Sequence, residues 1–298
     1  MSEPFQPELQ ACVDAAAGAA SLDDRTAVAL AGSFYKDFKT GQTTTTFGPG
    51  WDELLRVSPP GGYDGLALHH PASRTLVIVN RGTEGFTSLP DWMANVGAVL
   101  FRNPGPQMDD ALDLLLAAFD KVGGDAVGQI LICGHSLGGA LADAQGALAE
   151  SLFAGRGQTC PPVRVVGVAS AGFAHAAQSL AAARNLAISP RASSFITHYI
   201  RDEDPVPHHP GRSVFGTDQV VASVYETRGL PPPGPHSTGL QWSWLADLLL
   251  QHQRTLYFQF VDQSGGNHIW HSRNTGAFTP RPGHDPGWSP RLTRPDDW

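Results

Sequence analysis

The sequence predicts an α/β fold in which a mostly parallel central sheet is covered by helices on both faces. From about residue 63 to residue 262, short apolar runs of strand length alternate with longer segments of helical periodicity. Hydrophobic residues make up 41% of the 298 residues and charged residues only 16%, less than is usual, which favours a packed core. No internal repeat interrupts this alternation, so one domain is expected.

The first elements read as two strands, at 63–69 and 75–80, joined by a turn at Pro71. Leu112, Leu115 and Phe119 recur at helical spacing and predict a helix over 107–122. A strand at 129–133 then runs through a glycine-rich turn into a helix at 140–152. Further strands are expected at 163–169, 195–200 and 219–226, and a strongly apolar helix at 239–260.

The two ends of the chain differ from this pattern. Residues 1–62 are interpreted as an extension of helices and loops packed on the core, and residues 63–262 as the main domain. Residues 263–298 are rich in Pro, Gly, Trp and Arg. We expect this tail to form no regular core element and either to wrap the surface or to be disordered.

Charge and cysteine content narrow the classes of function. A net charge of -8 argues against nucleic-acid binding and against electrostatic adhesion to an anionic membrane. Cys12, Cys133 and Cys160 lack metal-ligand spacing, which favours a reducing compartment. The sequence shows neither a secretory signal nor an apolar stretch of membrane-spanning length. We therefore expect a cytoplasmic protein, or one exported by a pathway without an N-terminal signal peptide.

The segment Gly134-His135-Ser136-Leu137-Gly138 fits the pattern G-x-S-x-G. An apolar strand precedes it and a helix of small residues follows it, which is the setting that a nucleophile elbow requires. We expect Ser136 to have a strained backbone, and Gly134 and Gly138 to leave room where strand and helix pass closely. A phosphate-binding turn is the alternative, but the segment lacks both G-x-G-x-x-G and the Gly-Lys-Ser/Thr of a P-loop.

Other motifs extend this pattern along the chain. In order, they are Arg81-Gly82-Thr83 after a strand, Asp91-Trp92-x-x-Asn95, Gly134 to Ala140, and Asp204-Pro205-Val206-Pro207. Together they resemble the class 3 lipases, the fungal-type triglyceride lipase family. The resemblance covers about residues 63–257. It implies an α/β-hydrolase fold and hydrolysis of the acyl esters of lipids by a serine ester hydrolase, without a metal or other cofactor.

A serine hydroxyl becomes a good nucleophile only when a histidine accepts its proton, and that histidine needs an acid to orient it. Ser136 is the candidate nucleophile. The resemblance selects Asp204 as the acid, in preference to the neighbouring Asp202 and Glu203. His236, in a proline-rich loop before a helix, is the preferred base, and His252 remains the alternative.

The oxyanion hole is expected to use the backbone N–H of Leu137 and that of Thr83. Asp91 either braces the Thr83 loop or caps a helix, and Arg81 is interpreted as a structural residue. The apolar segment 84–106 occupies the position of the family's lid. As a hypothesis, it covers Ser136 and opens at a membrane or micelle interface.

Three alternatives were weighed. The histidine pairs His69-His70 and His208-His209, and His268 with His271, lack the partners of a zinc site, so no metal is expected. A hydrolase-fold protein that binds without catalysis is disfavoured by the complete set of motif residues. A phospholipase toxin secreted without a signal is permitted but not selected. The sequence does not reveal the acyl chain, the head group, a protein partner or the oligomeric state.

Overall fold

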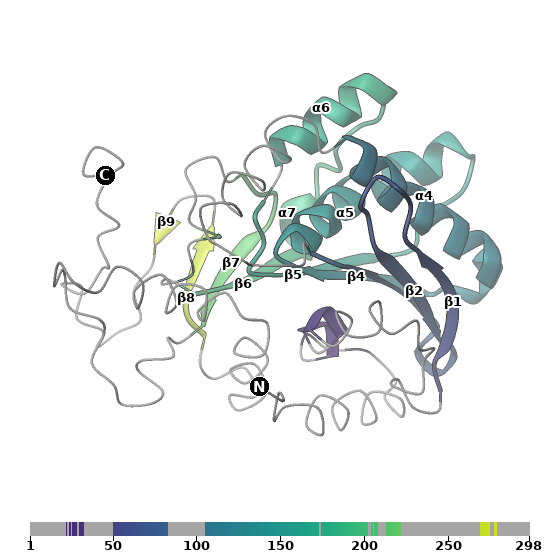
Figure 1. The fold of residues 1–298 in the computed structure, drawn as a ribbon, viewed down its shortest axis with the longest axis horizontal. Helices are drawn as coiled ribbons and strands as arrows, with labels where there is room; N and C mark the ends of the chain where they lie inside the picture. The colour runs from purple at the N-terminus through teal and green to yellow at the C-terminus, as the bar shows by residue number, and fades with distance from the viewer. Residues whose placement is uncertain are drawn as a thin grey trace, which may run out of the picture.

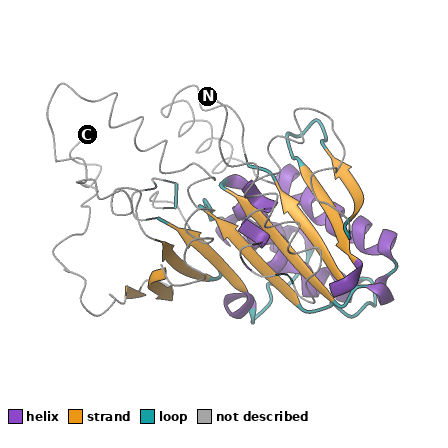
Figure 2. Cartoon of the chain, turned by 90° about the horizontal axis from the view of Figure 1, so that it is seen from below, coloured by secondary structure: helices purple, strands orange, loops and turns teal. Residues whose placement is uncertain are grey.

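A computed structural model shows one sheet with helices packed on it (Figure 1). It describes residues 22, 24, 26–28, 30–32, 50–82, 105–172, 174–201, 204, 206–207, 213–221, 269–274 and 277–278. Among these residues no helix is both long and apolar enough to cross a membrane. Figure 2 shows the strands lying side by side across the sheet.

The described residues form nine strands, which follow one another across the sheet in chain order. The first three are antiparallel, β3 to β7 are parallel, and the last two are again antiparallel. The predicted α/β fold with a mostly parallel sheet is therefore confirmed. The bounds are β1 Asp52–Val57, β2 Gly65–His70, β3 Thr75–Asn80, β4 Gln129–His135, β5 Val163–Val168, β6 Ile196–Ile200, β7 Thr217–Val221, β8 Ile269–Asn274 and β9 Ala277–Phe278.

The labelled helices lie on one face of the sheet (Figure 1). Each parallel connection moves to the next strand in the same direction, and right-handed crossovers made in one direction place their helices on the same side. The central helix α5 packs on β4 and β5 and against α4 and α6. The bounds are α4 Gly105–Val122, α5 Leu137–Gly155, α6 Ala174–Arg184 and α7 Ala192–Phe195.

Helical residues near the N-terminus cover the other face (Figures 1 and 2). Asp24 forms an ion pair with Arg164 of β5 and accepts a hydrogen bond from the Tyr199 hydroxyl of β6 at 2.7 Å. Val28 and Leu30 are buried beside this polar contact. The sheet therefore has helical segments on both faces, as predicted, and β2 and β3 are buried along their whole length.

The strands expected at 63–69, 75–80, 129–133, 163–169 and 195–200 and the helices at 107–122 and 140–152 are confirmed, with small shifts at their ends. The strand expected at 219–226 begins earlier, as β7, and the expected helix at 239–260 lies outside the described residues. Helix α6 and strand β1 were not predicted.

The expectation that residues 263–298 contain no regular element is wrong for β8 and β9. Strand β8 pairs antiparallel with β7, joining Asn274 to Thr217. The tail's prolines begin at Pro280, so the segment before them keeps its backbone donors for pairing. Composition averaged over the whole tail concealed this short stretch. The division into 1–62, 63–262 and 263–298 stays a prediction.

Candidate active site

The turn between β4 and α5 places Ser136 in a backbone conformation that L-residues rarely adopt. Its φ is 60° and its ψ is -122°, and Leu137 begins the helix directly after it. Such a conformation costs about 1–3 kcal/mol and persists only where the surroundings enforce it. The expected strand–turn–helix with a strained serine is therefore confirmed.

The two motif glycines permit this turn because no side chain fits at either position. A Cβ atom on Gly134 would lie 2.3 Å from the carbonyl oxygen of Gly138. A Cβ atom on Gly138 would lie 2.2 Å from the backbone oxygen of Asn80, at the end of β3. Both obstacles are backbone atoms, which cannot swing aside. The glycines therefore let β3, β4 and α5 meet at one point, as expected from the motif.

Backbone hydrogen bonds on both sides hold Ser136 in place. Its N–H donates to the carbonyl of Val168, at the end of β5, at 2.9 Å. Its own carbonyl accepts from the N–H of Gly139 at 3.1 Å and from that of Ala171 at 3.3 Å. The turn is thus joined to the segment that follows β5. These contacts supply the surroundings that keep the strained conformation.

Helix α5 directs its N-terminus at the serine. The amides of the first turn of a helix have no partner inside the helix, and the aligned peptide dipoles add a partial positive charge there. Leu137 is the first residue of this turn and is buried. Its N–H is therefore placed to donate to a developing oxyanion at the serine, as the motif suggests.

Asp204 follows β6 and is fully buried. Its Oδ1 accepts a hydrogen bond from the N–H of Val206 at 2.9 Å, and its own N–H donates to the carbonyl of Arg201 at 3.2 Å. These two bonds fold the chain sharply after the strand and fix the carboxylate. Its neighbours Asp202 and Glu203 lie outside the described residues.

Strand order brings the serine and this acid to the same edge of the sheet. Strands β4 and β6 run parallel, with β5 between them. The carboxyl ends of parallel strands share one edge, and neighbouring strands lie about 4.8 Å apart. The ends of β4 and β6 are therefore about 10 Å apart. Ser136 follows one end and Asp204 follows the other.

The loop after β3 begins from an anchored position. Arg81 forms an ion pair with Asp64 at 2.6 Å, and its N–H donates to the Asp64 carbonyl at 3.0 Å, as expected of a structural residue. The buried Asn80 accepts from the Tyr63 hydroxyl at 2.7 Å and donates to Gln145 of α5 at 2.6 Å. Burial, followed by nearby carboxylates, raises the pKa of Tyr63 and keeps its hydroxyl a donor.

The remaining predicted site residues lie outside the part of the chain that the structure describes. They are Thr83, Asp91, His236 and His252, together with most of the segment 84–106. Within the described residues, no group of three or more His, Cys, Asp or Glu side chains could hold a metal ion.

A buried polar cluster beneath the serine turn was missed by sequence reasoning. His198 of β6 lies between Asp143 of α5 and Asp218 of β7. The Ser170 hydroxyl donates a hydrogen bond to Asp143. The available signal was Asp143 itself, a carboxylate in the mostly apolar first half of the helix, seven residues after the serine. An ionised carboxylate is rarely fully buried without a partner. Its partners lie on distant strands, so the sequence does not show them.

Comparison with known proteins supports this description. Residues 101–214 match the family model of the class 3 lipases. The match confirms the resemblance carried by the motifs. This match covers less than half of the chain, and with the α/β sheet and the serine turn it agrees with a serine ester hydrolase. No curated protein matches the chain significantly.

Several solved structures are similar to the chain at low identity. The chain is similar to lipase II from Rhizopus niveus, with 17% identity over 73% of this chain and 82% of that one and a TM-score of 0.43. It is also similar to a deletion mutant of the Rhizomucor miehei lipase in complex with its propeptide, with 15% identity over 87% of this chain and 78% of that one and a TM-score of 0.47. A third similar structure is a triacylglycerol lipase whose catalytic centre is a serine protease triad, with 14% identity over 75% of this chain and 82% of that one and a TM-score of 0.45.

Proposed function

We propose that this protein hydrolyses carboxylic esters of lipids through a triad of Ser136, His236 and Asp204. The observation that carries the proposal is the strained backbone of Ser136 between β4 and α5. A strained residue held by its neighbours marks a place where geometry serves something other than stability. Here the strained residue lies directly before the first turn of α5, where the helix presents its N-terminal amides.

The reaction would proceed in two halves. His236 takes the proton of the Ser136 hydroxyl as its oxygen attacks the ester carbonyl, and the negative charge passes to the carbonyl oxygen. The N–H groups of Leu137 and Thr83 stabilise that oxyanion, each by roughly 3 kcal/mol. His236 then protonates the leaving alcohol, and an acyl-enzyme remains. A water molecule, deprotonated by the same histidine, releases the acid and restores the serine.

Asp204 would orient the histidine and stabilise its charged form. The buried carboxylate is held by the N–H of Val206, which fixes its direction. Because Asp204 and Ser136 follow parallel strands separated by one strand, an imidazole ring can stand between them. This separation suits either histidine candidate, so His252 remains the alternative base.

A panel of esters tests the proposal. Wild type should hydrolyse short and long acyl esters, and a fluorophosphonate should label Ser136. Ser136→Ala and His236→Ala should each lower kcat by several powers of ten, because the serine attacks only while the histidine accepts its proton. Full activity in His236→Ala with loss in His252→Ala would reassign the base. An unlabelled, inactive wild type would instead support a protein that binds without catalysis.

The interfacial part of the proposal concerns the segment 84–106. Its sequence carries Phe86, Leu89, Trp92, Val96 and Leu100, apolar enough to meet lipid. We propose that it covers the serine and moves aside at a lipid surface. Specific activity should then rise sharply when the same ester passes from monomers to micelles. Equal specific activity on monomers and on micelles would contradict the lid hypothesis but not the proposed triad.

A further inference from the structure

We infer that the buried cluster of Asp143, His198, Asp218 and Ser170 is a positioning network, which holds the nucleophile helix in register with the strand that leads to the acid. The inference rests on the proposed function, because it concerns the spacing between Ser136 and Asp204. None of the four residues belongs to the proposed triad.

The centre of the network is a histidine with a carboxylate at each ring nitrogen. The Nε2 atom of His198 lies 2.9 Å and 3.0 Å from the two carboxylate oxygens of Asp143. Its Nδ1 atom lies 3.3 Å from Oδ1 of Asp218. The side chains of His198 and Asp143 are 0% and 1% exposed, so the contacts are made without water screening. When the ring is protonated, it forms an ion pair with both acids.

A second branch reaches the serine turn itself. The hydroxyl of Ser170 donates to Oδ2 of Asp143 at 3.2 Å and accepts from the N–H of Gly172 at 3.2 Å. This arrangement shapes the turn after β5, whose Ala171 N–H donates to the Ser136 carbonyl at 3.3 Å. A continuous path of polar contacts thus runs from β6 through α5 to the backbone of the strained serine.

Close packing leaves the network little freedom to move. A Cβ atom on Gly167 would lie 2.8 Å from Cδ2 of His198, and one on Gly139 would lie 2.9 Å from Cβ of Ser170. The ring therefore stacks directly over β5, and the hydroxyl lies directly under the first turn of α5. Any loss of the central contacts must be absorbed by shifts of α5 or β6, the two elements that set the site.

The geometry excludes a catalytic role for His198. Both of its ring nitrogens face carboxylates, so neither is directed at Ser136. The hydroxyl of the nearby Ser170 donates to Asp143 rather than to the His198 ring. A second serine triad would need the hydroxyl on the histidine and access to substrate, and this cluster has neither.

Stability alone does not account for the network. Removing charges from water costs several kcal/mol for each ion, and apolar side chains of the same volume are often at least as stabilising. What an ionic cluster adds is a fixed relative geometry for the elements that carry its members. Asp143 lies on α5, His198 on β6 and Asp218 on β7, so the network specifies how these three elements sit together.

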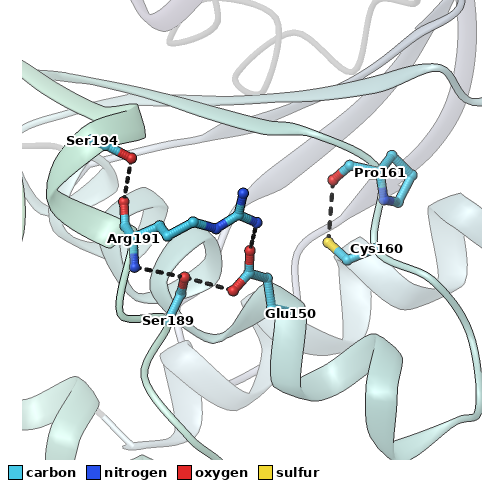
Figure 3. Close-up of polar contacts among 6 residues, drawn as sticks. All are labelled: Glu150, Cys160, Pro161, Ser189, Arg191 and Ser194. Carbon is cyan, nitrogen blue, oxygen red and sulfur yellow. Dashed lines mark hydrogen bonds and ion pairs between the residues drawn. The ribbon is translucent and has the colours of Figure 1, made fainter.

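The test compares Asp143→Asn and His198→Gln with a matched variant on the same helix. Glu150→Gln alters a second carboxylate of α5, which binds Ser189 and Arg191 far from the serine turn (Figure 3). Leu112→Ala, on α4, supplies a destabilised control, since it opens a cavity in the small apolar cluster that α4 forms with α5 and α6. For each variant, kcat, KM, the rate of fluorophosphonate labelling and the unfolding midpoint are measured on the full chain.

Asp143→Asn and His198→Gln should each lower kcat about 10- to 100-fold and leave KM within about twofold, because a misplaced nucleophile slows chemistry and not binding. Labelling should slow in parallel. The double variant should lose no more than the worse single variant, since the two act through each other. Glu150→Gln and Leu112→Ala should keep the wild-type kcat, whatever their midpoints.

Ser170→Ala keeps the inference testable should the charged variants not fold. It removes only the branch toward the serine turn, so we expect a native unfolding midpoint with kcat reduced severalfold. Wild-type kcat in Ser170→Ala would overturn the inference, and so would a folded and fully active Asp143→Asn. A wild type that neither hydrolyses esters nor reacts with the fluorophosphonate would overturn the proposed function instead, so the two failures are distinguishable.

Discussion

Replacing Gly138 by alanine should disable the site while most of the fold persists. The new methyl group would lie 2.2 Å from the backbone oxygen of Asn80 and 2.9 Å from the carbonyl carbon of Arg81. Ordinary contacts of this kind are about 3.5 Å. Relief therefore requires the first turn of α5 and the end of β3 to separate by roughly 1 Å.

This displacement determines how much both the free energy of unfolding and the turnover should fall. Overpacking against side chains costs about 1–3 kcal/mol, and a backbone obstacle places the change at the upper end, about 3 kcal/mol in free energy of unfolding. Ser136 moves with the turn, and a misplacement of about 1 Å lowers turnover about 100-fold. Activity should therefore fall much further than stability alone would explain at a temperature where the variant is folded.

Urea unfolding and ester hydrolysis on the same preparation measure the two effects. The matched control is Gly155→Ala on the same helix, where the added Cβ atom meets nothing within 4 Å. This control should be neutral or stabilised by roughly 0.5 kcal/mol, with unchanged kcat. A Gly138→Ala protein with wild-type stability and kcat would refute the argument that the close approach of β3 and α5 shapes the site.

Four further outcomes follow from the charges, thiols and strand edges of the described residues. The hydrogen bond from Ser189, and then that from Arg191, lowers the pKa of Glu150 (Figure 3). The stabilisation by Glu150 is therefore present above its unfolded-state pKa and is lost as the pH falls through its folded-state pKa. Glu150→Gln should make the urea midpoint depend less on pH between about pH 6 and 3. Burial raises the pKa of Asp110, so its charged form opposes folding, and Asp110→Asn should raise the unfolding free energy at pH 7 more than at pH 3. Burial raises the pKa of Cys160 to about 12, so alkylation at pH 8 should run at least about 100-fold slower in the native protein than in urea. Deleting 263–298 removes β8 and exposes the edge of β7, and light scattering should report association.

Local patterns made the nucleophile turn predictable from the sequence. Its requirements are two glycines, a serine between them, an apolar strand before and a helix after, all within about a dozen consecutive residues. The parallel core could be predicted for the same reason, because β4 and β5 are mostly apolar and helix α5 separates them in the chain. Helix α6 escaped prediction because its alanines bury only Ala174, Ala177 and Ala181 and leave a weak periodic pattern.

Long-range contacts could not be predicted in this way. His198 and Asp143 are separated by 55 residues, and each on its own fits an ordinary strand or helix. Only the sheet order, which brings β6 beside β5 under α5, makes them partners. The same limit applies to β8, whose pairing with β7 joins residues as far apart in the chain as Thr217 and Asn274.

The distance that the base must bridge between Ser136 and Asp204, rather than a sequence motif, decides between His236 and His252. A triad base must accept a hydrogen bond from Ser136 through one ring nitrogen and donate to Asp204 through the other. Two such bonds and the ring between them reach roughly 8 Å, which is close to the 10 Å or so between the ends of β4 and β6. The base must therefore stand over the carboxyl end of β5, on the side of the sheet edge where the amides of α5 point. Whichever histidine can reach that place from the chain after β7 is the base, and single substitutions of the two, read by kcat with KM, decide between them.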